Sequence, residues 1–67
     1  MSIGQRIKMV RVAKSKTQKS LAEDLGLKQN TVASYEIDRV QPSDRTISDI
    51  CRIFNVNEDW LRTGEGE

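Results

Sequence analysis

The chain has 67 residues, of which 11 are lysine or arginine and 10 are aspartate or glutamate, giving a formal net charge of +1. This length predicts one domain, near the lower limit for a chain that folds without disulfides or metals. A single cysteine and no histidine exclude an intrachain disulfide and leave no residues at zinc-ligand spacing. No apolar run approaches the roughly 20 residues of a membrane span and no secretion signal is visible, so we expect a cytoplasmic protein.

Capping residues and apolar spacing predict five helices, and no stretch has the alternation of a strand. The first helix begins after Ser2, which with Gln5 forms a capping-box pattern. Thr17 is a suitable N-cap for the second helix, Ser43 for the fourth and Asn57 for the fifth. We therefore predict an all-α fold.

The predicted ends of the helices follow from glycine and proline. The second helix ends before Gly26, the third runs over about residues 28–37, and Pro42 closes a polar loop behind it. Gly64 is a suitable stop for the fifth. We place the domain at residues 1–63 and read residues 64–67 as a polar tail or the start of a linker.

The predicted core consists of the apolar residues that recur at helical spacing on one face of each helix. Its members are Ile3, Ile7, Val10, Leu21, Ala22, Leu25, Val32, Tyr35, Ile47, Ile50, Cys51, Phe54, Val56, Trp60 and Leu61.

Residues 18–35 form the most informative stretch, two short amphipathic runs joined across Gly26. This glycine permits the positive φ that a short turn between steeply crossing helices needs. Ala22 is small enough for the second run to approach the first closely. The second run turns outward three side chains suited to hydrogen-bonding base edges in a DNA major groove: Gln29, Asn30 and Ser34.

Charge is distributed unevenly along the chain. Residues 1–41 carry a net charge of +4 and residues 42–67 a net charge of −3. An ordinary solvated surface would explain this asymmetry by itself. Because the basic part also contains the two amphipathic runs, we favour a surface that faces phosphates.

A resemblance to a known family rests on six segments taken together: IGQRIKMVR, TQKSLAEDLGL, NTVASYE, QPS, TISDICRIFNV and EDWLRTGEG. In their order and spacing the chain resembles, over residues 3–64, the lambda-repressor-like family of DNA-binding domains. This family includes phage repressors, Cro-type regulators and their bacterial relatives. The resemblance implies a compact five-helix domain with a helix-turn-helix in its second and third helices.

The resemblance also implies a function. We expect a sequence-specific regulator of transcription that binds double-stranded DNA, of the phage-type or bacterial repressor kind. Its third helix would enter the major groove, and because one short helix reads few base pairs, a homodimer would bind an inverted-repeat operator.

The expected contacts divide into base reading, phosphate binding and structural support. Gln29, Asn30 and Ser34 are expected to read bases, and the amides of the first two match adenine N6 and N7. The resemblance implies that Gln18 holds the DNA backbone and braces the first residue of the third helix. The resemblance implies a structural ion pair between Arg11 and Glu36. The remaining phosphate candidates are Lys16, Lys28, Arg39, Arg45 and Thr31, the last of which is equally suited to a thymine methyl group.

Three residues depart from the family pattern. Lys28 stands where a serine or threonine usually caps the recognition helix, and its charge opposes the helix dipole. Lys16 replaces a common leucine. Asp38 replaces a glycine or asparagine at a position of left-handed backbone, which aspartate tolerates less well than glycine.

No pattern indicates an enzyme, a cofactor, a metal or a small-molecule ligand. There is no glycine-rich phosphate loop and no nucleophile beside a base, and Cys51 lies on an apolar stripe, where packing explains it. The alternative function is a protein-interaction module of the antitoxin or anti-repressor type, which an exposed apolar patch would favour. A regulated fragment of a longer repressor is a further possibility.

Overall fold

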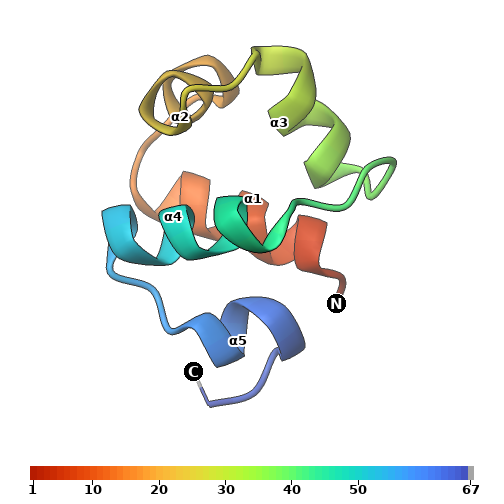
Figure 1. The fold of residues 1–67 in the computed structure, drawn as a ribbon, viewed down its shortest axis with the longest axis vertical. Coiled ribbons are helices and arrows are strands. Elements are labelled where there is room, and N and C mark those ends of the chain that lie inside the picture. The colour runs from red at the N-terminus through yellow and green to blue at the C-terminus, as the bar shows by residue number, and fades with distance from the viewer. Residues whose placement is uncertain (67) are drawn as a thin grey trace.

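The computed structural model describes residues 1–66 and consists of five helices joined by short loops (Figure 1). Helices α2 and α3 lie at one end of the molecule, α5 lies at the other, and α1 and α4 cross between them. The predicted five-helix, all-α fold is confirmed for the described residues. The helices are α1 (Ile3–Ala13), α2 (Gln18–Leu25), α3 (Gln29–Glu36), α4 (Asp44–Phe54) and α5 (Glu58–Thr63).

Four of these helices begin at the predicted capping residues. The Ser2 hydroxyl accepts a hydrogen bond from the Gln5 backbone N–H, and the Gln5 side chain accepts one from the Ser2 backbone. Thr17 forms a similar reciprocal pair with Ser20, which the sequence reading had not anticipated. Ser43 and Asn57 cap α4 and α5. Each cap satisfies a backbone N–H that the first turn of a helix leaves unpaired.

The helix ends also follow the predicted signals. Gly26 ends α2 with a φ of 70°, and Gly64 ends α5 with a φ of 86°. Helix α3 is one residue shorter at each end than predicted, because Lys28 and Ile37 are its caps. Of the predicted tail at residues 64–67, Glu67 lies outside the described residues.

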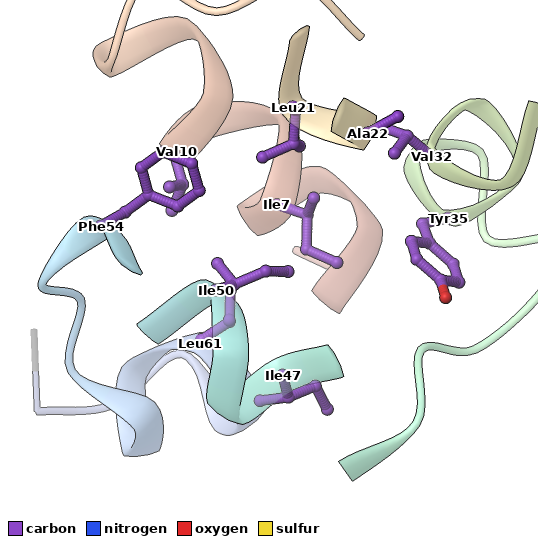
Figure 2. Packing of buried hydrophobic residues seen from close by; sticks show 10 residues of the cluster. All are labelled: Ile7, Val10, Leu21, Ala22, Val32, Tyr35, Ile47, Ile50, Phe54 and Leu61. Atoms are coloured by element: carbon purple, nitrogen blue, oxygen red, sulfur yellow. The ribbon is translucent and has the colours of Figure 1, made fainter. Parts of the chain in front are cut away.

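The core lies where all five helices meet, and each helix contributes to it (Figure 2). Burying side chains of this size, at about 1.5–3 kcal/mol each, provides the main driving force for folding. The buried members are Ile7, Val10, Leu21, Ala22, Val32, Tyr35, Ile47, Ile50, Phe54 and Leu61.

The predicted core was too large by five residues. Ile3, Leu25, Cys51, Val56 and Trp60 are only partly buried and pack against the rim of the cluster. Ile3 and Leu25 are terminal residues of their helices and Val56 lies in a connection, where the chain turns toward solvent.

Arg6 belongs to the basic part of the chain, residues 1–41, but it is buried and does not face solvent. It is only 6% exposed. Its guanidinium donates hydrogen bonds to the carbonyl oxygens of Met1, Leu61 and Arg62. Since Leu61 and Arg62 belong to the last turn of α5, Arg6 satisfies carbonyls that this helix leaves unpaired, and the positive charge lies at the negative end of the dipole.

Within residues 1–66, the helices are too short and too polar for any of them to traverse a lipid bilayer. No group of three metal-binding side chains occurs in this part of the chain.

Candidate nucleic-acid interface

Helices α2 and α3 form a tight helix-turn-helix. After the left-handed Gly26, the backbone N–H of Leu27 donates to the Ala22 carbonyl at 2.8 Å, which closes the end of α2. Ala22 is 2% exposed, and Figure 2 shows it beside Val32 of α3. A larger residue at position 22 would separate the two helices.

The first turn of α3 presents polar groups to solvent. Gln29 and Asn30 are exposed, whereas Thr31 and Ser34 are half-buried. The N-cap residue Lys28 makes no side-chain capping bond, as expected for a residue without an acceptor. The start of α3 therefore combines exposed amide side chains with uncapped backbone N–H groups, an arrangement suited to anionic and hydrogen-bonding ligands.

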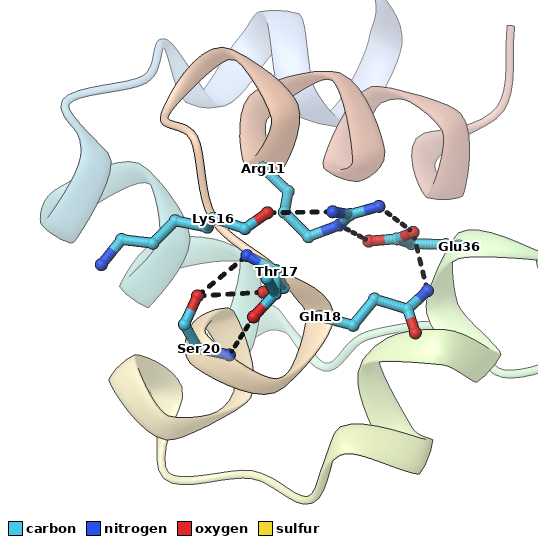
Figure 3. A network of polar contacts seen from close by, with 6 residues as sticks. All are labelled: Arg11, Lys16, Thr17, Gln18, Ser20 and Glu36. Carbon is cyan, nitrogen blue, oxygen red and sulfur yellow. Dashed lines mark hydrogen bonds and ion pairs between the residues drawn. The ribbon is translucent and has the colours of Figure 1, made fainter.

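The other end of α3 is fixed by a polar network around Glu36 (Figure 3). Arg11 of α1 donates to both carboxylate oxygens, from Nε to Oε2 at 2.6 Å and from Nη2 to Oε1 at 3.1 Å. The side chains are 14% and 4% exposed. The hydrogen bond to Glu36 raises the pKa of Arg11, against the opposing effect of burial. Such a bidentate pair fixes orientation as well as distance.

Two more groups complete this network. The Gln18 side-chain amide donates to Glu36 Oε1 at 3.1 Å, and Arg11 Nη1 donates to the Lys16 carbonyl at 2.9 Å. Gln18 thus braces the last residue of α3, whereas the resemblance implied a contact with the first. The network joins α1, α2 and α3 at one point, so the two helices of the motif are held against the scaffold.

The phosphate candidates fall into two groups. Lys28, Arg39 and Arg45 are exposed. Lys16 is engaged with Asp24, with Nζ and Oδ2 at 2.9 Å, and lies in place of the leucine that the resemblance led us to expect. A partner would have to compete with Asp24 for this lysine.

Sequence reasoning missed two side chains that support this surface. Asp38, which follows α3, accepts hydrogen bonds from the Ser2 hydroxyl and the Gly4 backbone N–H. Arg6 fastens α5 to α1. The departure from the family pattern at position 38 was the only signal for either contact.

A family model described as helix-turn-helix matches residues 7–61. The chain belongs to the helix-turn-helix family. The match includes all of α2, α3 and α4 and the turn at Gly26, so the family assignment rests on the motif itself and its supporting helices.

Curated relatives carry regulatory names. The chain is 36% identical over 61 residues to the HTH-type transcriptional regulator ImmR of Bacillus subtilis (strain 168), covering 91% of this chain and 48% of that protein. It is 34% identical over 65 residues to the HTH-type transcriptional regulator PrtR of Pseudomonas aeruginosa, covering 97% of this chain and 25% of that protein. The chain thus spans about half the length of ImmR and a quarter of PrtR.

A solved structure has the same fold. The P22 c2 repressor, crystallised in complex with a synthetic operator, superposes with a TM-score of 0.88, covering 97% of this chain and 98% of that chain at 18% sequence identity. Helix order and helix packing are therefore shared although most side chains differ.

Proposed function

We propose that this domain binds double-stranded DNA in a sequence-specific manner and regulates transcription as a repressor. The observation that carries the proposal is the exposed first turn of α3, with Gln29 and Asn30 at its start, held on a scaffold by the Arg11–Glu36–Gln18 network. A reader of base edges needs this combination of outward amides and a fixed helix axis.

The names of the relatives support the same function. Two relatives are called transcriptional regulators, and the P22 c2 repressor was crystallised with an operator. In this proposal Gln29, Asn30 and Ser34 read bases, while Gln18, Lys28, Thr31, Arg39 and Arg45 bind the backbone, joined by Lys16 once it is released from Asp24. The role is one of binding rather than catalysis, and it would be carried out in the cytoplasm.

Specificity requires a second copy of the domain. One short helix contacts only a few base pairs, so we propose a homodimer on an inverted repeat with half-sites about one helical turn apart. The segments proposed to meet across the two-fold axis are α5 and residues 40–45, which comprise the end of the loop after α3 and the start of α4. In that loop Val40 is 48% exposed, which makes it available for such a contact.

Selection of binding sites from a random duplex pool tests the proposal. The selection is performed at about 0.15 M salt, where screening suppresses binding that depends on charge alone. Recovery of an inverted repeat would support dimeric, sequence-specific recognition. Recovery of unselected DNA would contradict it.

A protein-interaction module is the second candidate function. Its support is a small apolar stripe on the outer face of α1, where Met9 is 46% and Val12 is 59% exposed. Because such a module has no reason to read bases, the selection would return no enriched sequence. Substituting Met9 and Val12 would then be the next step, whereas a DNA-binding domain would tolerate both changes.

A further inference from the structure

The segment that follows α3 is attached to the start of α1 through one aspartate. Asp38 Oδ2 accepts a hydrogen bond from the Ser2 hydroxyl at 2.6 Å, and Oδ1 accepts one from the Gly4 backbone N–H at 3.1 Å. These partners lie 36 and 34 residues away in the sequence. We call the carboxylate and its two donors the Asp38 latch.

The latch supplies what the start of α1 lacks. This helix has no acidic residue in its first turn, and the Gly4 N–H is among the groups that a helix start leaves unpaired. A carboxylate at this end is favoured both by the hydrogen bonds and by the positive end of the dipole. The interaction is therefore an N-terminal cap donated from a distant part of the chain.

The backbone at Asp38 is adapted to this contact. Its φ is 60°, a left-handed conformation that costs a non-glycine residue about 1 kcal/mol and is tolerated best by asparagine and aspartate. Glycine would adopt it without that cost but has no carboxylate to offer. The aspartate thus accepts backbone strain and gains two hydrogen bonds, one from the N-cap residue Ser2 and one from Gly4 of α1.

Helices α1 and α3 also approach each other through their backbones beside the latch. A Cβ atom added to Gly4 would lie 2.1 Å from the Tyr35 carbonyl oxygen and 2.6 Å from Asp38 Oδ1. Only glycine permits this approach. The end of α3 and the start of α1 are therefore in direct contact, and the latch closes over that contact.

Together with the Glu36 network, the latch attaches α3 to α1 at two points. Glu36 is held by Arg11 near the end of α1, and Asp38 is held at its beginning. One attachment point permits α3 to pivot, whereas two fix its angle. Arg39 follows Asp38 directly and its backbone N–H donates to the Ser34 carbonyl at 2.9 Å, so the latch and the end of α3 together place this phosphate candidate.

We propose that Asp38 is a positioning residue for DNA binding: its carboxylate sets the angle of α3 and the place of Arg39. This inference rests on the proposed function. If charge alone mattered, removing an acidic side chain next to a DNA-binding surface would raise the affinity for DNA. The positioning role predicts the opposite change in affinity. Loss of the latch should weaken binding.

The test compares two single substitutions by DNA titration on a selected site and on a scrambled duplex. Asp38→Gly keeps the left-handed backbone and removes the latch. Glu23→Gln removes one negative charge from an exposed position on α2 and leaves the latch intact. The Gly4 amide resonance reports whether its hydrogen bond is lost, and Asp38→Asn, which keeps one acceptor, provides a second variant should Asp38→Gly fold poorly.

We expect Asp38→Gly to bind the selected site about three- to tenfold more weakly, as for one or two lost hydrogen bonds, with a smaller loss on scrambled DNA. Glu23→Gln should bind equally well or more tightly, and Asp38→Asn should lie between Asp38→Gly and the parent. Equal or tighter binding by folded Asp38→Gly, or an equal loss on both duplexes, would overturn the latch proposal alone. If the parent chain binds no duplex DNA, the proposed function fails and the positioning role fails with it.

Discussion

Replacing Glu36 by glutamine should reveal how strongly the polar network stabilises the domain. The substitution preserves shape but removes the charge that pairs with Arg11, whose side chain is only 14% exposed. Removing one partner of a buried pair costs about 3–5 kcal/mol, because the other charge is left without compensation. Arg11 keeps its bond to the Lys16 carbonyl and some access to water, so we expect a cost around the lower end of that range, about 2–4 kcal/mol.

This loss is large for so small a domain. At roughly 0.05–0.15 kcal/mol per residue, a chain of this length has a free energy of unfolding of about 3–10 kcal/mol. Urea unfolding followed by circular dichroism measures the change. The matched control is Asp49→Asn, which breaks the pair with Arg52 in which the arginine is 72% exposed. We expect that change to cost about 0.5 kcal/mol or less.

A double-mutant cycle separates the ion pair from packing. Arg11→Met and Glu36→Met are each expected to destabilise, but the second change should cost less in the presence of the first, by about 1–3 kcal/mol. If Glu36→Gln costs no more than Asp49→Asn, or if the two methionine changes are additive, the pair is not the constraint that its geometry indicates.

Three further predictions concern single side chains. Gln29→Ala should reduce the preference for the selected DNA site, whereas Arg39→Ala should weaken binding to all sequences about equally. Titration on selected and scrambled duplexes distinguishes the two effects. An equal loss of affinity on both duplexes for Gln29→Ala would count against α3 as the helix that reads bases. Arg6→Leu should lower the free energy of unfolding by about 2–4 kcal/mol, because three carbonyls lose a charged donor; a cost below about 1 kcal/mol in urea unfolding would refute this. Burial, and then the nearby Glu58, raise the pKa of the Cys51 thiol, so more of it is protonated in the folded chain at mildly alkaline pH. Its alkylation should be about tenfold slower in the folded than in the urea-unfolded chain, and stability should fall as the pH rises through the thiol's ordinary range, whereas equal alkylation rates would contradict the burial argument.

The helices could be predicted because their signals are local. The side chain of each capping residue accepts a hydrogen bond from the backbone N–H three residues further on, so the cap and its partner are close in the sequence. These capping residues are Ser2, Thr17, Ser43 and Asn57. Apolar spacing identified the ten buried residues for the same reason, since it reports which side of a helix faces inward. Three of its five errors, Ile3, Leu25 and Val56, lay at helix ends or in a connection, whereas Cys51 and Trp60 lie within helices at the rim of the core.

The resemblance implied the Arg11–Glu36 pair, which the structure contains. The contacts of Arg6 and Asp38 could not be predicted, because their partners are distant in the sequence. Arg6 reaches Leu61 across 55 positions, and Asp38 reaches Gly4 across 34. Nothing near Arg6 distinguishes it from a solvated lysine or arginine. At Asp38 the departure from the family pattern raised the question of backbone strain, but only the fold shows that the carboxylate satisfies the start of α1.

The fate of the basic residues leads to a last prediction, about salt. Of the eight lysines and arginines in residues 1–41, Arg6, Arg11 and Lys16 are engaged within the domain. Two of the remaining five, Lys28 and Arg39, are exposed phosphate candidates, and Arg45, which follows this range, is the third. While Lys16 stays paired with Asp24, three neutralised phosphates give a slope of log affinity against log salt of about −2.7 for one domain and about −5.4 for a dimer.

The measured slope therefore counts domains as well as charges. A single domain with three phosphate contacts and one short reading helix would lose most of its affinity at about 0.15 M salt. Sequence-specific binding at that salt concentration therefore requires two domains. Titration of the selected duplex over a range of salt should give a slope near the dimer value. With Arg39→Ala the slope should become less steep by about two, one for each copy. A slope near −2.7, reduced by only one in Arg39→Ala, would mean that one domain binds alone and would refute the dimer.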